Sequence, residues 1–291
     1  MGIDMKNILI TILIALLVSY TVTTFVQPKT TLAPKNLKES TYDRVIRTGI
    51  IRCGYGLWQP ALMKDPNTGK LSGIYYDYLE QLGHELGLKI EWAQELDLST
   101  YLQDLNNGRI DLECSGGWPN AFRGKFVDYT TPIYFNPVYM YARKGFKVDP
   151  EHLDALNRPD VRFSVQEGET SAIYRAKIWP KTTVYTTLGS APIMEYIAAL
   201  AYNKADVALC DQMSMKPWMA QNPGAVYRVS DKPVFFIANN MSVPAGETRF
   251  LNMLNTATQQ MLYSGDIERI LKKYNVEPIE ALRVALPYQT P

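Results

Sequence analysis

The sequence of 291 residues has few metal-binding side chains and no excess of either charge. It holds two histidines and three cysteines, and 30 basic residues stand against 29 acidic ones. The first 40 residues hold four of the basic and two of the acidic residues, which leaves 26 and 27 for the rest. No basic face is implied, so nucleic acid is not an expected partner. His84 and His152 have no metal-ligand spacing around them, so we expect no metal and no cofactor.

The odd number of cysteines excludes a fully paired disulfide framework. Cys53, Cys114 and Cys210 each lie in an apolar run that is typical of a strand, which favours buried thiols. A bridge between Cys53 and Cys114 would require an oxidising compartment. The sequence leaves both alternatives open.

The N-terminal segment contains a long apolar run, residues 8–20, which follows Lys6 as in a secretory signal. Together with residues 21–26 the run is nearly long enough to span a bilayer. We therefore expect residues 1–26 to be a signal peptide or membrane anchor and residues 27–40 to be a linker. The protein is expected to be periplasmic or exported, with residues 6–26 as its only contact with the inner membrane.

Beyond the linker, predicted strands alternate with predicted helices. Residues 50–54, 88–92 and 110–114 read as strands, and apolar residues recur at helical spacing between Tyr75 and Leu86. This alternation predicts an α/β fold with parallel strands.

An internal repeat indicates two similar lobes. Residues 105–115 and 200–210 each contain a helix end, a turn, an aspartate and an apolar strand. The aspartates are Asp111 and Asp206. In such sheets, ligands bind beyond the carboxyl ends of the strands, so two facing lobes would share one cleft.

We therefore predict two Rossmann-like lobes joined by a hinge of two crossings, near Phe135–Tyr141 and Val234–Met241. The first lobe would comprise residues 41–137 and 238–291, and the second residues 138–237. Hinges of this kind absorb backbone rotation while each lobe moves as a rigid body.

Several short motifs then occur in a recognisable order between Tyr42 and Tyr274. They are Thr68–Gly73, Gly108–Asp111, Arg123 with Val127–Tyr134, Gln166–Thr170 and Ala205–Asp211. This order resembles the periplasmic amino-acid-binding proteins of ABC importers, the family 3 extracellular solute-binding proteins. The resemblance implies a type II periplasmic binding protein clamp that is not an enzyme. It would act as a monomer, bind a small amino-acid-like ligand and deliver it to ABC transporter permease subunits.

The resemblance also assigns roles to three polar residues. Arg123 would hold the ligand α-carboxylate with its planar donor fork, although a surface ion pair with Asp128 is the alternative. Asp211 would accept hydrogen bonds from the α-ammonium, or cap the following helix. Thr170 would donate to the carboxylate, or act only as an N-cap.

Aromatic and glycine residues complete the predicted site. Trp58 would cover the ligand side chain, with ordinary packing as the alternative. Trp118 stands where the family has a small hydroxyl residue, while the backbone N–H groups of Gly116 and Gly117 would still receive the carboxylate. Gly56 offers no side chain to a charged ligand group, which favours a neutral, aromatic or atypical amino acid.

Two alternative functions are also compatible with the sequence. One is an exported enzyme similar to cyclohexadienyl dehydratase, which has the same fold and would need a general acid. Glu113, Glu167 and Glu169 are the candidates, and Glu169 is the best placed. The other is a membrane-tethered sensor domain that signals through a separate partner.

Overall fold

The structure is a computed structural model that describes residues 5–25 and 39–284. It divides into two compact units, Met1–Glu39 and Ser40–Pro291. The described part of the first unit contains helix α1, Met5–Phe25. Within the described residues, no helix combines the length and the apolar character needed to cross a membrane. Residues 27–38 of the predicted linker lie outside the described residues.

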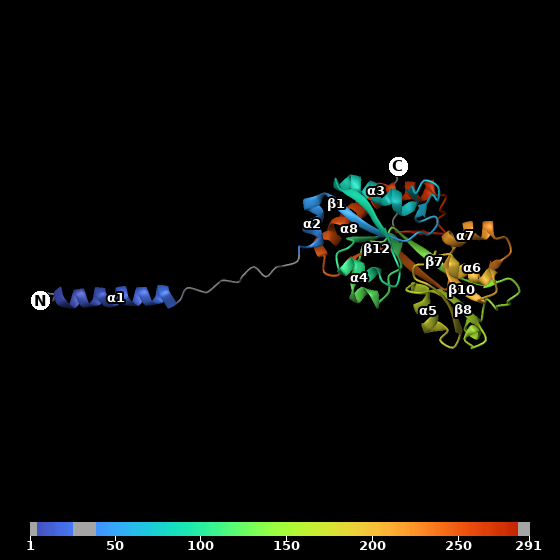
Figure 1. Cartoon of the computed structure of the whole chain (residues 1–291), viewed down its shortest axis with the longest axis horizontal. Coiled ribbons are helices and arrows are strands. Elements are labelled where there is room, and N and C mark those ends of the chain that lie inside the picture. The colour runs from blue at the N-terminus through green and yellow to red at the C-terminus, as the bar shows by residue number, and fades with distance from the viewer. Residues whose placement is uncertain (1–4, 26–38, 285–291) are drawn as a thin grey trace, which may run out of the picture. The chain divides into compact units, whose positions relative to one another are not determined.

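The first lobe of the second unit is built on three parallel strands, with β1 between β4 and β5. Helices α2, α3, α4 and α8 lie around these strands (Figure 1). The three strands predicted in this region are β1, β4 and β5. The elements are α2 (Thr41–Thr48), β1 (Ile50–Tyr55), β2 (Met63–Lys64), β3 (Leu71–Ser72), α3 (Ile74–Leu86), β4 (Lys89–Glu95), α4 (Tyr101–Asn106), β5 (Leu112–Gly117), the 3-10 helix η1 (Arg123–Lys125), β6 (Val127–Tyr129), α8 (Thr248–Tyr263) and α9 (Asp266–Lys273).

The second lobe repeats this plan, with β8 in parallel between β9 and β10. Helices α5, α6 and α7 accompany these strands (Figure 1). The elements are η2 (Leu153–Leu156), β8 (Arg162–Gln166), α5 (Thr170–Ile178), β9 (Thr183–Thr187), α6 (Glu195–Ala201), β10 (Val207–Asp211), α7 (Gln212–Gln221) and β11 (Val226–Arg228).

Two long strands, β7 (Tyr134–Arg143) and β12 (Phe235–Pro244), join the lobes. Their sheet order is β4-β1-β5-β12-β7-β10-β8-β9, so β12 pairs with the first lobe and β7 with the second. The two strands also pair with each other antiparallel, and the short strand β13 (Leu282–Arg283) pairs with β7. Both predicted crossings fall on these strands, whereas the predicted lobe boundaries stay a prediction.

The internal repeat corresponds to a repeated ion-pair arrangement. Asp111, before β5, accepts from the backbone N–H of Arg52 at 2.7 Å and from the guanidinium groups of Arg44 and Arg52. Asp206, before β10, accepts from the N–H of Arg162 at 2.8 Å and from the guanidinium groups of Arg143 and Arg162. Each aspartate therefore ties the start of one strand to a neighbouring strand.

A disulfide joins Cys53 of β1 to Cys114 of β5, with the Cα atoms 5.5 Å apart, and Cys210 is a buried free thiol. The bridge closes a loop of 61 residues. It ties together two strands whose carboxyl ends continue into the segments around Trp58 and Trp118. The alternative that the sequence left open is thus resolved in favour of the bridge.

We expect the double variant Cys53→Ala/Cys114→Ala to unfold at lower denaturant concentration, with a free energy of unfolding lower by about 2–4 kcal/mol. The bridge stabilises the fold chiefly by restricting the unfolded chain. Chemical denaturation with and without reductant measures the effect. Cys210→Ala is the control, because its unfolding should stay sensitive to reductant. A count of three reactive thiols in unreduced, unfolded wild type would contradict the bridge.

Candidate functional site

One cavity lies between the two lobes, and all seven residues predicted for the ligand site line it. These are Trp58, Gly116, Gly117, Trp118, Arg123, Thr170 and Asp211. The other lining residues are Gly56, Leu98, Tyr101, Glu113, Ser115, Glu169, Ile193, Tyr196, Cys210 and Ser214. The lining residues lie in or after strands β1, β4, β5, β8, β9 and β10, so the carboxyl ends of strands from both lobes form the walls, as expected.

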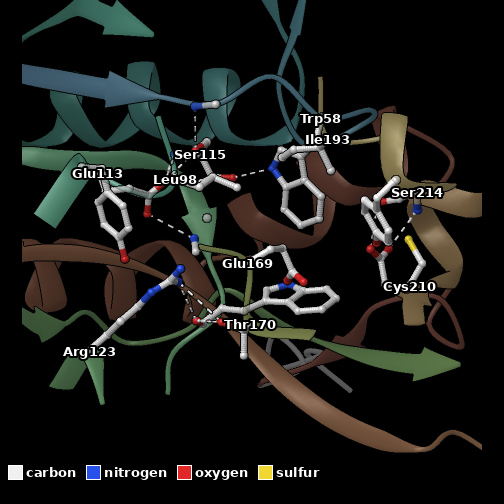
Figure 2. Close-up of a pocket in the computed structure, with 17 residues that line it drawn as sticks. Trp58, Leu98, Glu113, Ser115, Arg123, Glu169, Thr170, Ile193, Cys210 and Ser214 are labelled. Atoms are coloured by element: carbon white, nitrogen blue, oxygen red, sulfur yellow. Dashed lines mark hydrogen bonds between the residues drawn. The ribbon is translucent and has the colours of Figure 1, made fainter. Parts of the chain in front are cut away.

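Arg123 connects the lobes across the cleft. It opens η1 and is buried, with its guanidinium carbon 5.2 Å from the centroid of the Tyr101 ring. Nη2 donates to the carbonyl oxygen of Gly168 in the second lobe. Nη1 donates to the carbonyl oxygen of Trp118 at 3.4 Å and to Thr170 Oγ1 at 3.5 Å (Figure 2). The alternative of an ion pair with Asp128 is not among these contacts, and the binding of a ligand carboxylate stays a prediction.

Other contacts show that the cleft is closed in this structure. Thr170 Oγ1 donates to the carbonyl oxygen of Trp118 at 2.9 Å and accepts from Asn120 Nδ2 at 3.2 Å. The N–H of Leu98 donates to the carbonyl oxygen of Gly189 at 3.2 Å. Thr170 is the first residue of α5, and Glu169 is the N-cap, so the alternative that Thr170 is only a cap is wrong.

Asp211 ends β10 and caps α7. Oδ1 accepts from the N–H of Ser214 and Oδ2 from Ser214 Oγ, both at 2.8 Å. Burial raises the pKa of Asp211 from 3.8 to about 6, although its hydrogen bonds oppose this shift. Both predicted roles are therefore compatible, because the residue caps a helix and also lines the cavity.

Two further carboxylates line the cavity, and neither was predicted as a binding residue. Glu113 lies in β5, where Oε1 accepts from Ser115 N at 2.9 Å and Ser115 Oγ at 2.6 Å, and Oε2 from Gly117 N at 3.1 Å (Figure 2). Glu169 accepts from Ser171 N at 2.6 Å and from Ser171 Oγ. Burial raises the pKa of both glutamates. A glutamate between Leu112 and Cys114, inside an apolar strand, is the signal that could have revealed the first.

The two predicted tryptophans form one wall. Their rings are nearly perpendicular, with centroids 6.5 Å apart. Trp58 Nε1 donates to the carbonyl oxygen of Ser115 at 2.7 Å, which fixes its ring, whereas Trp118 Nε1 is buried with no partner among the described residues. Trp118 therefore offers an open, uncharged donor.

Gly116 and Gly117 contribute backbone to this wall. Gly116 has φ +81°, and a Cβ there would overlap the Tyr75 ring, so the position favours glycine. The N–H of Gly117, which was predicted to receive a ligand carboxylate, donates to Glu113 instead.

The cavity thus combines three carboxylates, Glu113, Glu169 and Asp211, with one guanidinium, Arg123. Its electrostatics favour a positively charged occupant over an anion. Among the described residues, no group of three or more histidine, cysteine, aspartate or glutamate side chains has an arrangement suited to a metal ion.

These features define a binding protein with two α/β lobes that close around a small solute. The sequence model of the bacterial extracellular solute-binding proteins, family 3, matches residues 51–277, and the chain belongs to this family. The prediction of a solute-binding protein is therefore confirmed. Membership in an extracellular family also agrees with the predicted export.

Individual relatives are distant. The "Probable histidine-binding protein" of Campylobacter jejuni is 22% identical over 72% of this chain and 78% of its own length. An ancestral amino-acid-binding protein, described as a precursor of cyclohexadienyl dehydratase, is 25% identical, with 81% of this chain and 99% of that chain covered and a TM-score of 0.68. An ancestral arginine-binding protein bound to arginine is 24% identical, covers 78% and 98%, and has a TM-score of 0.67. The predicted type II fold is confirmed.

The raised pKa of Asp211 predicts how the ligand-free protein responds to pH. The folded state binds this proton more tightly than the unfolded chain, so the carboxyl lowers stability as pH rises from about 4 to about 6. Asp211→Asn should therefore raise the free energy of unfolding at pH 7 by up to about 3 kcal/mol and leave it nearly unchanged at pH 4. An asparagine can still accept from Ser214 N.

Thermal unfolding between pH 4 and pH 7 measures this effect. Asp206→Asn is the control with the opposite sign. Burial alone would raise the pKa of Asp206, but hydrogen bonds from Arg162 and Arg143 hold it below its ordinary value. That variant should lose stability at pH 7. A destabilised Asp211→Asn at pH 7 would contradict the prediction.

Proposed function

We propose that the chain is the substrate-binding component of an ABC importer and that it closes on a small cationic, amino-acid-like solute. The observation that carries the proposal is a closed cavity with walls from both lobes, in which three carboxylates face one guanidinium. The names of two relatives, which refer to histidine and arginine, agree with a cationic ligand.

Within this proposal two pairs of residues contact the ligand. Asp211 would hold a positive charge of the ligand, together with Glu169. Trp58 and Trp118 would flank its apolar part and attract a cation through their ring faces. The sequence alone disfavours a ligand with a charged side chain, because Gly56 has no side chain that could pair with it. Glu113 and Glu169 would provide the opposite charge instead.

The proposed mechanism is closure of the two lobes around the ligand. The ligand would stabilise the closed form by its extra contacts with the second lobe, and the transporter would recognise that form. Arg123 and Thr170 support it, because their hydrogen bonds to Gly168 and Trp118 join the lobes.

The oligomeric state, the transporter partner, the export and the lobe boundaries are proposed as expected from the sequence. The chain would act as a monomer, deliver its ligand to permease subunits and be exported by means of residues 1–26. The two lobes would comprise residues 41–137 with 238–291, and residues 138–237.

A thermal-shift panel tests this function with cationic solutes (L-lysine, L-arginine, L-histidine and their decarboxylated amines) and acidic ones (L-glutamate, L-aspartate, succinate). At least one cation should raise the melting temperature, and the acids should not, because a ligand that binds only the folded form stabilises it. If only the acids gave a shift, or if no solute did, the proposal would be wrong.

Arg123→Ala should weaken the binding of the cation found in that panel by about 10- to 100-fold, the equivalent of a lost charge-assisted hydrogen bond. The change removes the link to Gly168, so closing becomes less favourable. Calorimetry gives the affinity, and small-angle scattering shows whether the bound form stays open. Lys125→Ala is the control, because Lys125 is exposed and does not line the cavity. Equal affinities for both variants would contradict this role.

We also propose that the ligand leaves unchanged. Of the three candidates for a general acid, Glu167 is exposed and does not line the cavity. Glu113 and Glu169 accept hydrogen bonds from Ser115, Gly117 and Ser171, which engage each carboxyl within the protein. Incubation with prephenate or arogenate should therefore yield no product by chromatography. Turnover that is lost in Glu169→Gln would instead support the enzyme.

A further inference from the structure

Resting on the proposed function, we infer that the solute is an organic amine or guanidine without a carboxylate, and that Glu113 determines this preference. Several donors of the cavity wall, among them the N–H groups of Ser115 and Gly117, already donate to the protein, whereas three carboxylates contribute acceptor oxygens. An amino acid brings a carboxylate that needs donors, whereas its decarboxylated amine brings only donors and positive charge.

Four hydroxyl groups in the cavity wall donate to the protein itself. Each of the following donors has a protein acceptor within 3.0 Å: Ser115 Oγ to Glu113, Ser214 Oγ to Asp211, Thr170 Oγ1 to the Trp118 carbonyl oxygen and Tyr196 Oη to the Leu209 carbonyl oxygen. A hydroxyl carries a single proton, so these groups can offer a ligand only lone pairs.

Glu113 occupies the backbone donors of the first lobe. One carboxylate oxygen accepts from the N–H of Ser115 and the other from the N–H of Gly117, at 2.9 and 3.1 Å. A ligand carboxylate would need this same arrangement of two N–H groups and two oxygens. The protein's own carboxylate therefore competes for the place, and it adds a negative charge that repels another anion.

Arg123 is also engaged. Its two terminal nitrogens donate to carbonyl oxygens of both lobes, at Trp118 and Gly168. A ligand carboxylate that approached these nitrogens would compete with the bonds that join the two lobes. Trp118 Nε1 is buried with no partner among the described residues, and it is an uncharged donor. A ligand carboxylate would also be buried beside three other carboxylates, which is costly.

The acceptors that remain suit a cation. Glu169 and Asp211 each accept hydrogen bonds from a serine within one helical turn. A carboxylate has about four acceptor positions. Both carboxylates therefore retain free lone pairs. Burial raises the pKa of Glu113 and of Glu169, and the nearby Arg123 guanidinium opposes both shifts. Three carboxylates thus share one guanidinium in the lining, so the site has room for a further positive charge from the ligand.

Matched pairs that differ by one carboxylate test the inference on the wild-type protein. They are cadaverine and L-lysine, agmatine and L-arginine, and histamine and L-histidine. In the pair that binds most tightly, calorimetry should show the amine at least about tenfold tighter than the amino acid. An amino acid that binds as tightly as its amine, or tighter, would overturn the inference.

The failure of the proposed function can be told apart from the failure of this inference. If cationic amino acids bind and their amines do not, the inference is wrong while the clamp function stands. If only uncharged amino acids bind, the inference and the cationic solute of the proposed function are both wrong, while solute binding between the lobes stands. If no solute of any kind binds, the proposed function fails, and the inference fails with it.

Glu113→Gln then tests the residue. The amide keeps the volume, but it removes the charge and one of the two acceptor oxygens, so the N–H of Gly117 becomes free. The ratio of amine to amino-acid affinity should fall by about tenfold. Glu95→Gln is the matched control, because Glu95 is exposed at the end of β4 and pairs with Lys64. An unchanged ratio in a folded Glu113→Gln would assign the preference to another group.

Discussion

The burial of three carboxylates beside a single guanidinium is the constraint on which the site depends. A carboxylate that loses water on closure has to find donors within the protein, and each of the three does so in its own chain segment. Glu113 uses the turn at the end of β5, whereas Glu169 and Asp211 use the first turns of α5 and α7. Several backbone N–H groups at the strand and helix ends are thereby paired, and the three carboxylates retain acceptor positions for a solute.

This constraint requires lobes that are rigid on their own, because the cavity forms only where two separate surfaces meet. The paired aspartates provide that rigidity. Asp111 and Asp206 each bind a backbone N–H and two arginines, at corresponding places in the two lobes. The disulfide between Cys53 and Cys114 adds a covalent tie in the first lobe. Relative motion is then left to β7 and β12, which carry the chain between the lobes.

Much of this arrangement could be predicted from the sequence, since it follows from local patterns. The alternation of strands and helices, the repeat around Asp111 and Asp206, and the positions of the crossings all depend on periodicity and turn chemistry. The seven predicted site residues come together because parallel strands bring their carboxyl ends to one edge. The partners of individual side chains could not be predicted, since these depend on distances between segments far apart in the chain. The link from Arg123 to Gly168 and the hydrogen bonds of Glu113 are of this kind.

Two features of the site, Trp118 and Glu113, have the same effect on its hydrogen-bond donors. Trp118 replaces a small hydroxyl residue and so removes a group that could donate to an anion. Its indole leaves one neutral N–H in the cavity. Glu113 acts in the same direction, because it occupies two backbone donors and contributes a charge. Either change alone would weaken the binding of a carboxylate. Together they indicate a site that has shifted from recognising both charges of an amino acid towards recognising the positive one.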